Sequence, residues 1–530
     1  MKKINILKNI RIILAIITFS IIIFFFIDFA EILPIELKFF TKIQFVSALF
    51  SLNFIILAII FIFTLVFGRI YCSIICPMGV FQDIIAWFSK KIFKKRKYKY
   101  YKPKHILRLS VLGFVIISWF LSYSFVLGLL EPYSSFGRIA VNIFKPIYIA
   151  ANNLLENIFT NFEIYTFYKE PLFITTTFSF VTTMFTLLII IILSTFWGRI
   201  YCNTICPVGT FLGYLAKLSI FKIRINEEKC NKCGLCVKKC KALCINSIEA
   251  KVDYSRCINC FNCLESCSKK ALSFSIYKYH KKLKNNKKII NLKNDKYKKD
   301  TTKIDENLRK FLVTVVAAGL TLPKAFANKK LASFVLKIDN KKEYNLLQPI
   351  SPPGSQSIEH FNKKCTSCYL CISKCSQKVL KPAFKEYGIK GIMQPVMKFD
   401  KGFCNFDCTI CSEVCPNAAI LPLTKEQKHL TQVGKVVFLL ENCIVHTDGT
   451  SCGACSEHCP TQAVTMKTYK NGLTIPQINQ DLCVGCGGCE YICPVRPYRA
   501  IHVEANKIHL SANPIEKNNI NEIKIDDFGF

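Results

Sequence analysis

The chain has 530 residues, with 71 lysines and arginines against 35 aspartates and glutamates, for a formal net charge of +36. The basic residues form short runs beside long apolar stretches, which follows the positive-inside rule and argues against a nucleic-acid-binding protein. The 29 cysteines do not fit a disulfide scaffold, because such scaffolds are short secreted chains. Most of them fall in C-x2-C-x2-C-x3-C runs, the thiolate spacing of 4Fe–4S clusters.

Four apolar stretches in the N-terminal part predict transmembrane helices. Each is about 20 residues long, enough to cross ~30 Å of hydrocarbon. The N-terminus and the loop at 90–104 are rich in lysine, whereas the loop at 131–172 is not, so the charge bias places both ends of this four-helix unit in the cytoplasm. The stretches lie near residues 11–30, 46–67, 106–130 and 173–197.

The second and fourth stretches run into the same motif, Gly-Arg-Ile-Tyr-Cys-x-x-Ile-Cys-Pro-x-Gly, starting at Gly68 and again at Gly198. The unit is therefore a repeated hairpin with its thiols at the inner membrane surface. If the helix continues through the motif, its two cysteines share one helical face, and the following proline disfavours further helix. We expect a redox or metal site; the alternative is that small thiols only let the helices pack closely. The four thiols are Cys72, Cys76, Cys202 and Cys206.

Two cluster motifs follow the membrane unit in the arrangement of a two-cluster ferredoxin, in which the fourth cysteine of each motif ligates the other cluster. Zinc is the rival for an isolated C-x2-C pair, but these motifs hold more cysteines than zinc needs. Cys244 lies outside the register and is expected to be a small buried residue. We assign one cluster to Cys230, Cys233, Cys236 and Cys267, and the other to Cys257, Cys260, Cys263 and Cys240.

Four more motifs recur at nearly even spacing in the C-terminal half, which makes them an internal repeat. Only the first gap varies, in the second and third of them, as an insertion in a loop would. Their fourth ligands come from adjacent or nested partners, which the spacing does not decide. The motifs are Cys365, Cys368, Cys371, Cys375; Cys404, Cys408, Cys411, Cys415; Cys443, Cys452, Cys455, Cys459; and Cys483, Cys486, Cys489, Cys493.

Other redox motifs are missing from the sequence. There is no C-x-x-C-H for covalent haem, no G-x-G-x-x-G after a strand for a dinucleotide, and no Walker loop. Six cluster motifs without these partners indicate a protein that relays electrons, and no catalytic residue is assigned.

With these motifs in place, residues 1–275 resemble NapH, the four-helix membrane ferredoxin-type protein of periplasmic nitrate reductase systems, and are similar to MauN and the membrane part of NosR. Residues 305–510 resemble NapG and MauM, so the chain looks like a fusion of the two, or of the related pair in nitrous oxide reductase systems. The resemblance implies oxidation of quinol, six 4Fe–4S clusters held by every motif cysteine, and electrons passed to a periplasmic c-type cytochrome and its terminal reductase.

The expected fold class is an α-helical membrane unit of four transmembrane helices plus α+β bacterial-type ferredoxin domains. The membrane part is a multi-pass inner-membrane protein, with the first ferredoxin domain in the cytoplasm. The expected domains are a membrane domain, a two-cluster ferredoxin domain, a lysine-rich linker, a signal-like or fifth membrane segment and a four-cluster ferredoxin domain, at 1–220, 221–277, 278–307, 308–328 and 329–530.

The junction between the halves bears on topology. Arg309 and Lys310 precede a short apolar core that ends in Ala325-Phe326-Ala327, the anatomy of a signal peptide. NapG proteins begin with a twin-arginine signal, R-R-x-F-L, but here Leu308 stands where the first arginine belongs. We expect 311–327 to direct export of the C-terminal half to the periplasm; the alternative is a soluble helix with that half in the cytoplasm.

The leading hypothesis is the quinol-oxidising component of a dehydrogenase. Acidic residues at the predicted outer helix ends, Asp28, Glu31 and Glu131, are candidate proton acceptors, with interfacial anchoring as the simpler role. An accessory or maturation factor that reduces a metal centre in a partner oxidoreductase is the alternative. A regulatory membrane sensor comes third, because six clusters exceed its needs.

Overall fold

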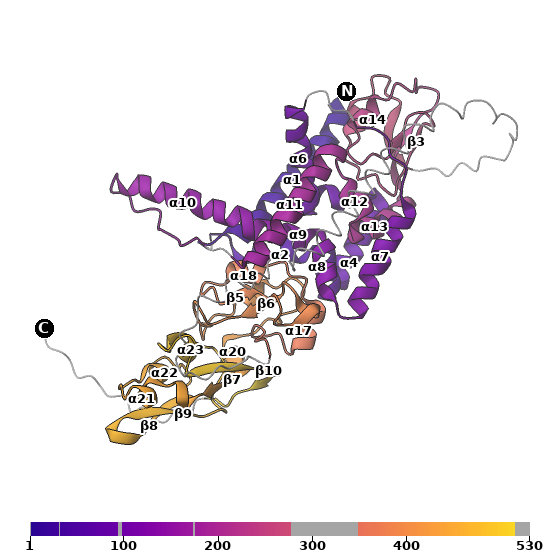
Figure 1. The fold of residues 1–530 in the computed structure, drawn as a ribbon. Coiled ribbons are helices and arrows are strands. Elements are labelled where there is room, and N and C mark those ends of the chain that lie inside the picture. The colour runs from indigo at the N-terminus through magenta and orange to yellow at the C-terminus, as the bar shows by residue number, and fades with distance from the viewer. Residues whose placement is uncertain (1, 31, 94–97, 173–174, 277–347, 515–530) are drawn as a thin grey trace, which may run out of the picture. The chain divides into compact units, whose positions relative to one another are not determined.

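The computed structural model describes residues 2–30, 32–93, 98–172, 175–276 and 348–514. They form a helical unit and two small α+β units that carry the cluster motifs (Figure 1). The predicted linker and signal-like segment, at 278–328, and Glu31 lie outside the described residues.

Among the described residues, two helices are long and apolar enough to cross a membrane by length and composition. Within α1 (Lys2–Ile27) the apolar part is Ile6–Ile27, with a mean hydropathy of 2.8, and α11 (Thr177–Trp197) has a mean hydropathy of 2.2. Two shorter apolar helices, α4 (Phe54–Phe67) and α7 (His105–Phe120), accompany them.

The other two predicted spans are interrupted, which differs from the expected four continuous helices. The 46–67 stretch divides into α3 (Phe45–Phe50) and α4, and the 106–130 stretch divides into α7 and α8 (Ser124–Leu130). A residue in the left-handed region breaks each one, Leu52 at φ 54° and Ser122 at φ 64°. Neither break carries the glycine or proline that announces a helix end in a sequence.

The helix also does not continue through the repeated motif. It stops at Gly68 (φ 71°, ψ −153°) and Gly198 (φ 62°, ψ −115°), and these pairs of backbone angles lie in a region that glycine alone adopts readily. A single turn, α5 (Tyr71–Ile74) or α12 (Ile200–Thr204), then carries the first cysteine. The prolines do not end a helix but begin one, because a fixed φ and a missing N–H suit the first helical position. These helices are α6 (Pro77–Ile92) and α13 (Pro207–Leu215).

Shorter elements complete the helical unit, and among them α10 projects from it as a separate arm (Figure 1). They are η1 (Ile35–Lys38), α2 (Phe39–Lys42), α9 (Pro132–Ile139), the π-helical η2 (Ala140–Phe144), α10 (Lys145–Thr160) and η3 (Ala216–Leu218).

The first ferredoxin unit is closed by β1 (Phe221–Ile225), which pairs antiparallel with β4 (Leu272–Ile276). The two strands bring the ends of the unit together and leave both cluster motifs between them. Within the unit lie α14 (Leu235–Lys239), the hairpin of β2 (Ile245–Asn246) and β3 (Lys251–Val252), and α15 (Asn262–Glu265).

The second ferredoxin unit repeats this plan with three antiparallel strand pairs, β5–β6, β7–β10 and β8–β9. The strands are β5 (Leu380–Pro382), β6 (Pro395–Met397), β7 (Thr431–Phe438), β8 (Val464–Thr468), β9 (Thr474–Ile478) and β10 (Ile501–Ser511). The helices are α17 (Ile358–Lys364), α18 (Leu370–Lys374), η5 (Gly388–Gly391), α19 (Ile410–Val414), α20 (Lys425–Leu430), η6 (Leu440–Asn442), α21 (Ile444–Thr447), α22 (Ala454–Glu457), η7 (Lys470–Gly472) and α23 (Gly488–Ile492).

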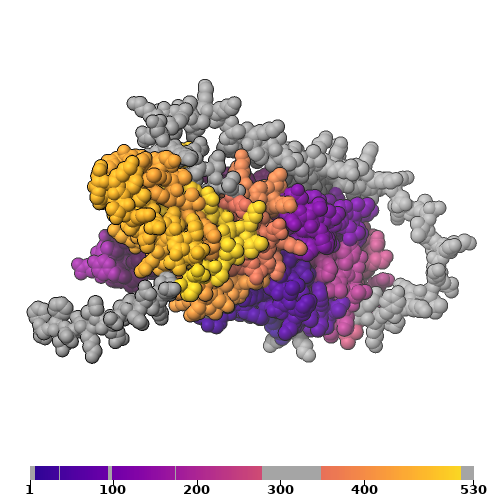
Figure 2. Space-filling model, turned by 90° about the horizontal axis from the view of Figure 1, so that it is seen from below, coloured from indigo at the N-terminus to yellow at the C-terminus, as the bar shows by residue number. Residues whose placement is uncertain are grey.

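The buried apolar core joins the helical unit to both ferredoxin units. It includes Phe136 of the helical unit, Ile258 of the first ferredoxin unit and Ile372 of the second. The last two cluster motifs share a separate core around Val464 and Ile501. Figure 2 shows the second ferredoxin unit, in orange and yellow, against the indigo and purple helical unit.

Candidate iron–sulfur and thiol sites

Four of the six motifs wrap their cysteines in the same backbone conformation. The residues just before and just after the second cysteine both have positive φ, as in Lys232 and Gly234 or Ser367 and Tyr369. Such left-handed turns aim successive N–H groups into a hollow and favour anionic groups such as Fe–S clusters. The two motifs with a stretched first gap, those of Cys404 and Cys443, lack this pair of residues.

The first ferredoxin unit brings its cysteines together in two groups, each around its own cavity. Quartet 1 is Cys230, Cys233, Cys236 and Cys267. Quartet 2 is Cys257, Cys260, Cys263 and Cys240. Each group takes three cysteines from one motif and the fourth from the other, which is the exchange that the spacing predicts.

Cys244 is a buried residue, as expected, but its position is closer to the site than the sequence indicates. Its Sγ lies 3.6 Å from the Sγ of Cys240, and its side chain is 1% exposed. It also lines the cavity of quartet 2. No spacing pattern marks this contact, because Cys244 belongs to no motif.

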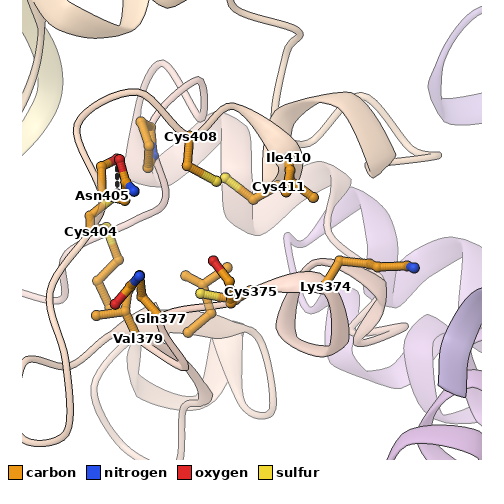
Figure 3. A pocket seen from close by; sticks show the side chains of 13 residues that line it. Lys374, Cys375, Gln377, Val379, Cys404, Asn405, Cys408, Ile410 and Cys411 are labelled. Carbon is orange, nitrogen blue, oxygen red and sulfur yellow. Dashed lines mark hydrogen bonds between the residues drawn. The ribbon is translucent and has the colours of Figure 1, made fainter. Parts of the chain in front are cut away.

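The second ferredoxin unit shows the pairing that its sequence leaves open. Quartet 4 surrounds a cavity into which Cys404 and Cys375 project, while Lys374 points away from it (Figure 3). Quartet 6 surrounds another cavity. Each takes its fourth cysteine from the adjacent motif, so the four motifs pair as neighbours. Quartet 4 is Cys404, Cys408, Cys411 and Cys375, and quartet 6 is Cys443, Cys452, Cys455 and Cys493.

The remaining cysteines complete the same exchange. Cys415 is an electrostatic neighbour of the first three cysteines of its partner motif. In the same way, Cys459 is an electrostatic neighbour of the first three cysteines of the last motif. Quartet 3 is therefore Cys365, Cys368, Cys371 and Cys415, and quartet 5 is Cys483, Cys486, Cys489 and Cys459. Four cysteines around one hollow, with no disulfide among them, fit a 4Fe–4S cluster.

No three His, Cys, Asp or Glu side chains among the described residues converge as they would on a single metal ion.

Quartets 3 to 6 form a series that begins at the helical unit. The carbonyl oxygen of Cys368 lies so close to Gly137 of α9 that a Cβ there would approach it to 2.4 Å. At the other end of the first pair, the Cys404 N–H donates to the Cys486 carbonyl at 2.9 Å. This hydrogen bond joins quartet 4 to quartet 5.

The four thiols of the helical unit are all buried, at 3–4% exposure. Arg69 of the first motif donates to the Cys202 carbonyl at 3.1 Å, and Arg199 of the second motif donates to the Cys72 carbonyl. Each arginine thus completes the other motif. The two motifs are one site and not two.

The glycine after each C-x3-C-P segment has a packing reason. A Cβ at Gly79 would lie 2.3 Å from the Cys72 carbonyl oxygen, and one at Gly209 would lie 2.2 Å from that of Cys202. Any side chain would push the next helix away from the thiols. In addition, the Cys206 Sγ accepts the Gly209 N–H at 3.2 Å and caps α13.

The electrostatics of the site favour the neutral thiol form. Burial raises the pKa of Cys76 and Cys206 well above the usual value, and that of Cys202 to about 11. Gln82 donates to the Cys202 Sγ at 3.4 Å. A bound metal would have to displace these protons.

A buried carboxylate, Asp83, holds three cations beside the thiols, and sequence reasoning missed it. It accepts from Arg199 Nε at 2.8 Å and pairs with Arg11 at 3.2 Å and Lys241 at 3.3 Å. Burial alone would raise the pKa of Asp83, but Arg199, Lys241 and Arg11 hold it well below its usual range. Lys241 follows Cys240, so this network reaches quartet 2.

Direct hydrogen bonds join the thiol site to the first ferredoxin unit. Arg69 donates to the Ser255 carbonyl at 3.0 Å, and Arg108 donates to the Ser255 hydroxyl at 2.9 Å. Asn203 donates to the Ala242 carbonyl at 2.9 Å. Quartet 2 is therefore the quartet of the first unit that faces the helical unit.

The second ferredoxin unit binds the helical unit through buried polar contacts. Lys374 Nζ lies 3.1 Å from Asp28 Oδ2, and Ser179 donates to the Tyr369 hydroxyl at 2.8 Å. At the other end of α1, Lys8 pairs with Glu265 of the first ferredoxin unit. At 1.5 Å per helical residue, the contacts at Lys8 and near Asp28 are about 30 Å apart along α1.

Two of the candidate proton acceptors are engaged in structure. Asp28 forms the ion pair with Lys374, and Glu131 caps α9 by accepting the N–H groups of Tyr133 and Ser134. Both carboxylates are 2% exposed. These contacts favour the anchoring role.

Comparison with known proteins supports the chemistry of these sites. A family described as "4Fe-4S binding domain" matches residues 50–96 and 179–226, the two hairpins. A "4Fe-4S dicluster domain" matches residues 450–496. No solved structure matches the chain.

Several curated proteins are similar to parts of the chain. The ferredoxin-type protein NapF of Escherichia coli K12 is 29% identical over 157 residues, 30% of this chain and 87% of NapF. The ferredoxin-type protein NapG of the same strain is 28% identical, over 27% of this chain and 65% of NapG. The putative electron transport protein YccM of Escherichia coli K12 is 24% identical, over 42% of this chain and 56% of YccM. The chain is an iron–sulfur electron-transfer protein that contains 4Fe–4S binding domains.

Proposed function

We propose that this protein is an inner-membrane relay that oxidises quinol and passes the electrons through six 4Fe–4S clusters to a periplasmic cytochrome c. One observation carries the proposal: the two ferredoxin units bind opposite ends of α1, about 30 Å apart, which is the thickness of the hydrocarbon core. The reductase it serves is that of nitrate or nitrous oxide respiration, by resemblance to NapH and NapG.

Two features support a membrane location. Helices α1 and α11 are long and apolar enough to span, and the exposed side chains of α1 include Ile13, Ile16 and Ile17 at 48–57% exposure. In a bilayer these side chains would contact lipid, whereas their exposure to water would cost free energy. The broken helices α3–α4 and α7–α8 complete a four-span unit.

The charge pattern supports the sidedness. The lysine-rich N-terminus lies at the α1 end that holds the first ferredoxin unit, and Tyr101 of the second lysine-rich segment donates its N–H to the Leu243 carbonyl of that unit, so this unit faces the cytoplasm. The second unit, bound beyond the other end, then faces the periplasm. Its position at Asp28 supports export of the C-terminal half.

The thiol site lies on the route between the two ferredoxin units. Arg69 binds both the Ser255 carbonyl of the first ferredoxin unit and the Cys202 carbonyl of the thiol site. On the other side, Cys76 is an electrostatic neighbour of Glu131, which is in turn an electrostatic neighbour of Cys368 in quartet 3. When bound, each 4Fe–4S cluster accepts and releases one electron at a time. The helical unit accordingly holds a redox or metal site that joins quartet 2 to quartet 3.

The test is reduction by quinol. The full chain, loaded with iron and reconstituted in lipid, is mixed with a reduced menaquinol analogue, and the visible absorbance of the clusters is followed. We expect partial bleaching. An absorbance that stays unchanged with menaquinol but bleaches with dithionite would show that quinol is not the donor.

A further inference from the structure

Helix α10 leaves the helical unit as an arm with one apolar face. Ile147, Leu154 and Ile158 are 61, 62 and 45% exposed and recur at the spacing of one helical face. Figure 1 shows α10 projecting from the unit. The face has no partner among the described residues.

The opposite face of α10 is polar and is occupied. Asn152 donates to the Tyr168 carbonyl at 2.9 Å, and Asn153 donates to the Glu170 carbonyl at 2.8 Å and accepts the Glu170 N–H at 3.0 Å. These bonds fasten the returning segment, 161–172, along the helix. Glu170 in turn pairs with Lys378 of the second ferredoxin unit at 2.7 Å. The apolar face therefore points away from that unit.

The root of the arm lies at the outer end of α1. The ring of Phe29, two residues beyond the end of α1, packs on Tyr148 at 5.5 Å and on Tyr168 at 5.8 Å. The returning segment also exposes Phe162 and Tyr165, at 71 and 77%. Exposed aromatic rings at the end of a span are typical of the interface between membrane and water.

We propose that α10 lies in the outer surface of the bilayer, with Ile147, Leu154 and Ile158 at the boundary between head groups and acyl chains. This inference rests on the proposed membrane location. We assign the bilayer to this apolar face because α10 starts where α1 ends, and because the face points away from the second ferredoxin unit and toward the side of the membrane-spanning helices.

The charge of the arm specifies how it binds. Residues 145–172 carry two lysines, Lys145 and Lys169, against three glutamates, and Lys145 is buried against Ser373. The arm thus has no basic patch for anionic lipid. Apolar contact alone holds it, so binding is independent of lipid charge and of salt. The arm, through Glu170 and Lys378, braces the second ferredoxin unit at a fixed height above the membrane.

The experiment places a photo-crosslinking p-benzoylphenylalanine at Ile158 of the full chain, in vesicles of phosphatidylethanolamine and phosphatidylglycerol. Val181 on α11 and Ile508 on β10, 42 and 65% exposed, are the matched control positions. We expect phospholipid adducts, identified by mass spectrometry, at positions 158 and 181 and none at 508. The yield at 158 should stay the same in vesicles without phosphatidylglycerol and in high salt.

The controls separate this inference from the membrane location. Lipid adducts at 181 but not at 158 would overturn the arm's role alone, and adducts at neither would overturn the membrane location itself. A protein adduct at 158 would identify a second copy or another subunit as the occupant and overturn the bilayer. If the variant at 158 does not fold, the probe at Leu154 makes the same test.

Discussion

The two hairpins share a motif but differ in the residues at its C-terminal side. Aligned on Gly68 and Gly198, the sixteenth residue is Asp83 in the first hairpin and Gly213 in the second. Asp83 holds Arg199 of the other hairpin. Gly213 lies against Ser255 of the first ferredoxin unit, whose carbonyl oxygen would be 2.4 Å from a Cβ there. The two hairpins thus share the thiol motif, whereas at this position the first supplies the carboxylate of the ion pairs and the second packs a glycine against Ser255.

The largest expected effect tests the chemistry that the hairpins share. Replacing the second thiol of each motif, Cys76→Ser with Cys206→Ser, should abolish menaquinol-linked reduction of the clusters while iron content stays that of all six clusters. The control is Ser73→Ala, which removes a buried hydroxyl that donates to the Ile70 carbonyl within the same motif. Normal electron transfer in the double variant would leave the thiols with a packing role only.

Arg69 and Arg199, which each bind the other hairpin, should contribute different amounts to the free energy of unfolding. Arg199→Met removes the ion-pair partner of a buried carboxylate, at a cost of about 3–5 kcal/mol. Arg69→Met removes hydrogen bonds to neutral groups, at about 1–3 kcal/mol. Thermal unfolding in detergent compares the two. Equal losses of stability in the two variants would mean that the ion pair with Asp83 adds nothing to the contribution of Arg199.

The packing of the second hairpin against Ser255 is tested by Gly213→Ala. The added methyl meets the Ser255 carbonyl and should cost about 1–3 kcal/mol, with loosening of the first ferredoxin unit measured by proteolysis. The matched control is Gly113→Ala in α7, where a Cβ meets nothing within 4 Å. That variant should be neutral or slightly stabilising, because alanine favours helix. Equal protease sensitivity of the two variants would contradict the packing role of Gly213.

The smallest effect is on acid stability. Because the folded pKa of Asp83 lies below its unfolded value of about 3.9, its ionised form stabilises the fold above that pH. This contribution should be lost as the pH falls below about 4. Asp83→Asn should be less stable at neutral pH, and its difference from the wild type should shrink in acid. A difference that does not change with pH would show that Asp83 is protonated in the fold.

Spacing alone was enough for the local chemistry. The exchange between quartets 1 and 2 follows from two regular motifs, and the structure places the same cysteines together. The neighbour pairing in the second unit could not be predicted, because four equivalent motifs allow several exchanges. The contact of Cys244 with Cys240 was equally hidden.

Long-range geometry was the part that spacing could not supply. The helix breaks at Leu52 and Ser122 occur without a glycine or proline, and Ser51, Asn53 and Ser122 are only weak turn signals, so the sequence alone does not predict them. Arg69 and Arg199 each bind the other hairpin, and the two hairpins have the same motif but lie far apart in the sequence. A sequence shows that both motifs exist, but only the fold shows that each completes the other.

The mutual binding of the two hairpins also has a consequence for how the protein is made. Asp83 leaves the ribosome 116 residues before Arg199, an interval of roughly ten seconds at ordinary rates of synthesis. Until then Asp83 lacks its ion-pair partner Arg199, and the Cys72 carbonyl lacks the hydrogen bond that Arg199 donates. The nascent first hairpin therefore depends on membrane-insertion factors or chaperones, and its buried polar contacts are complete only after the second hairpin has been synthesised.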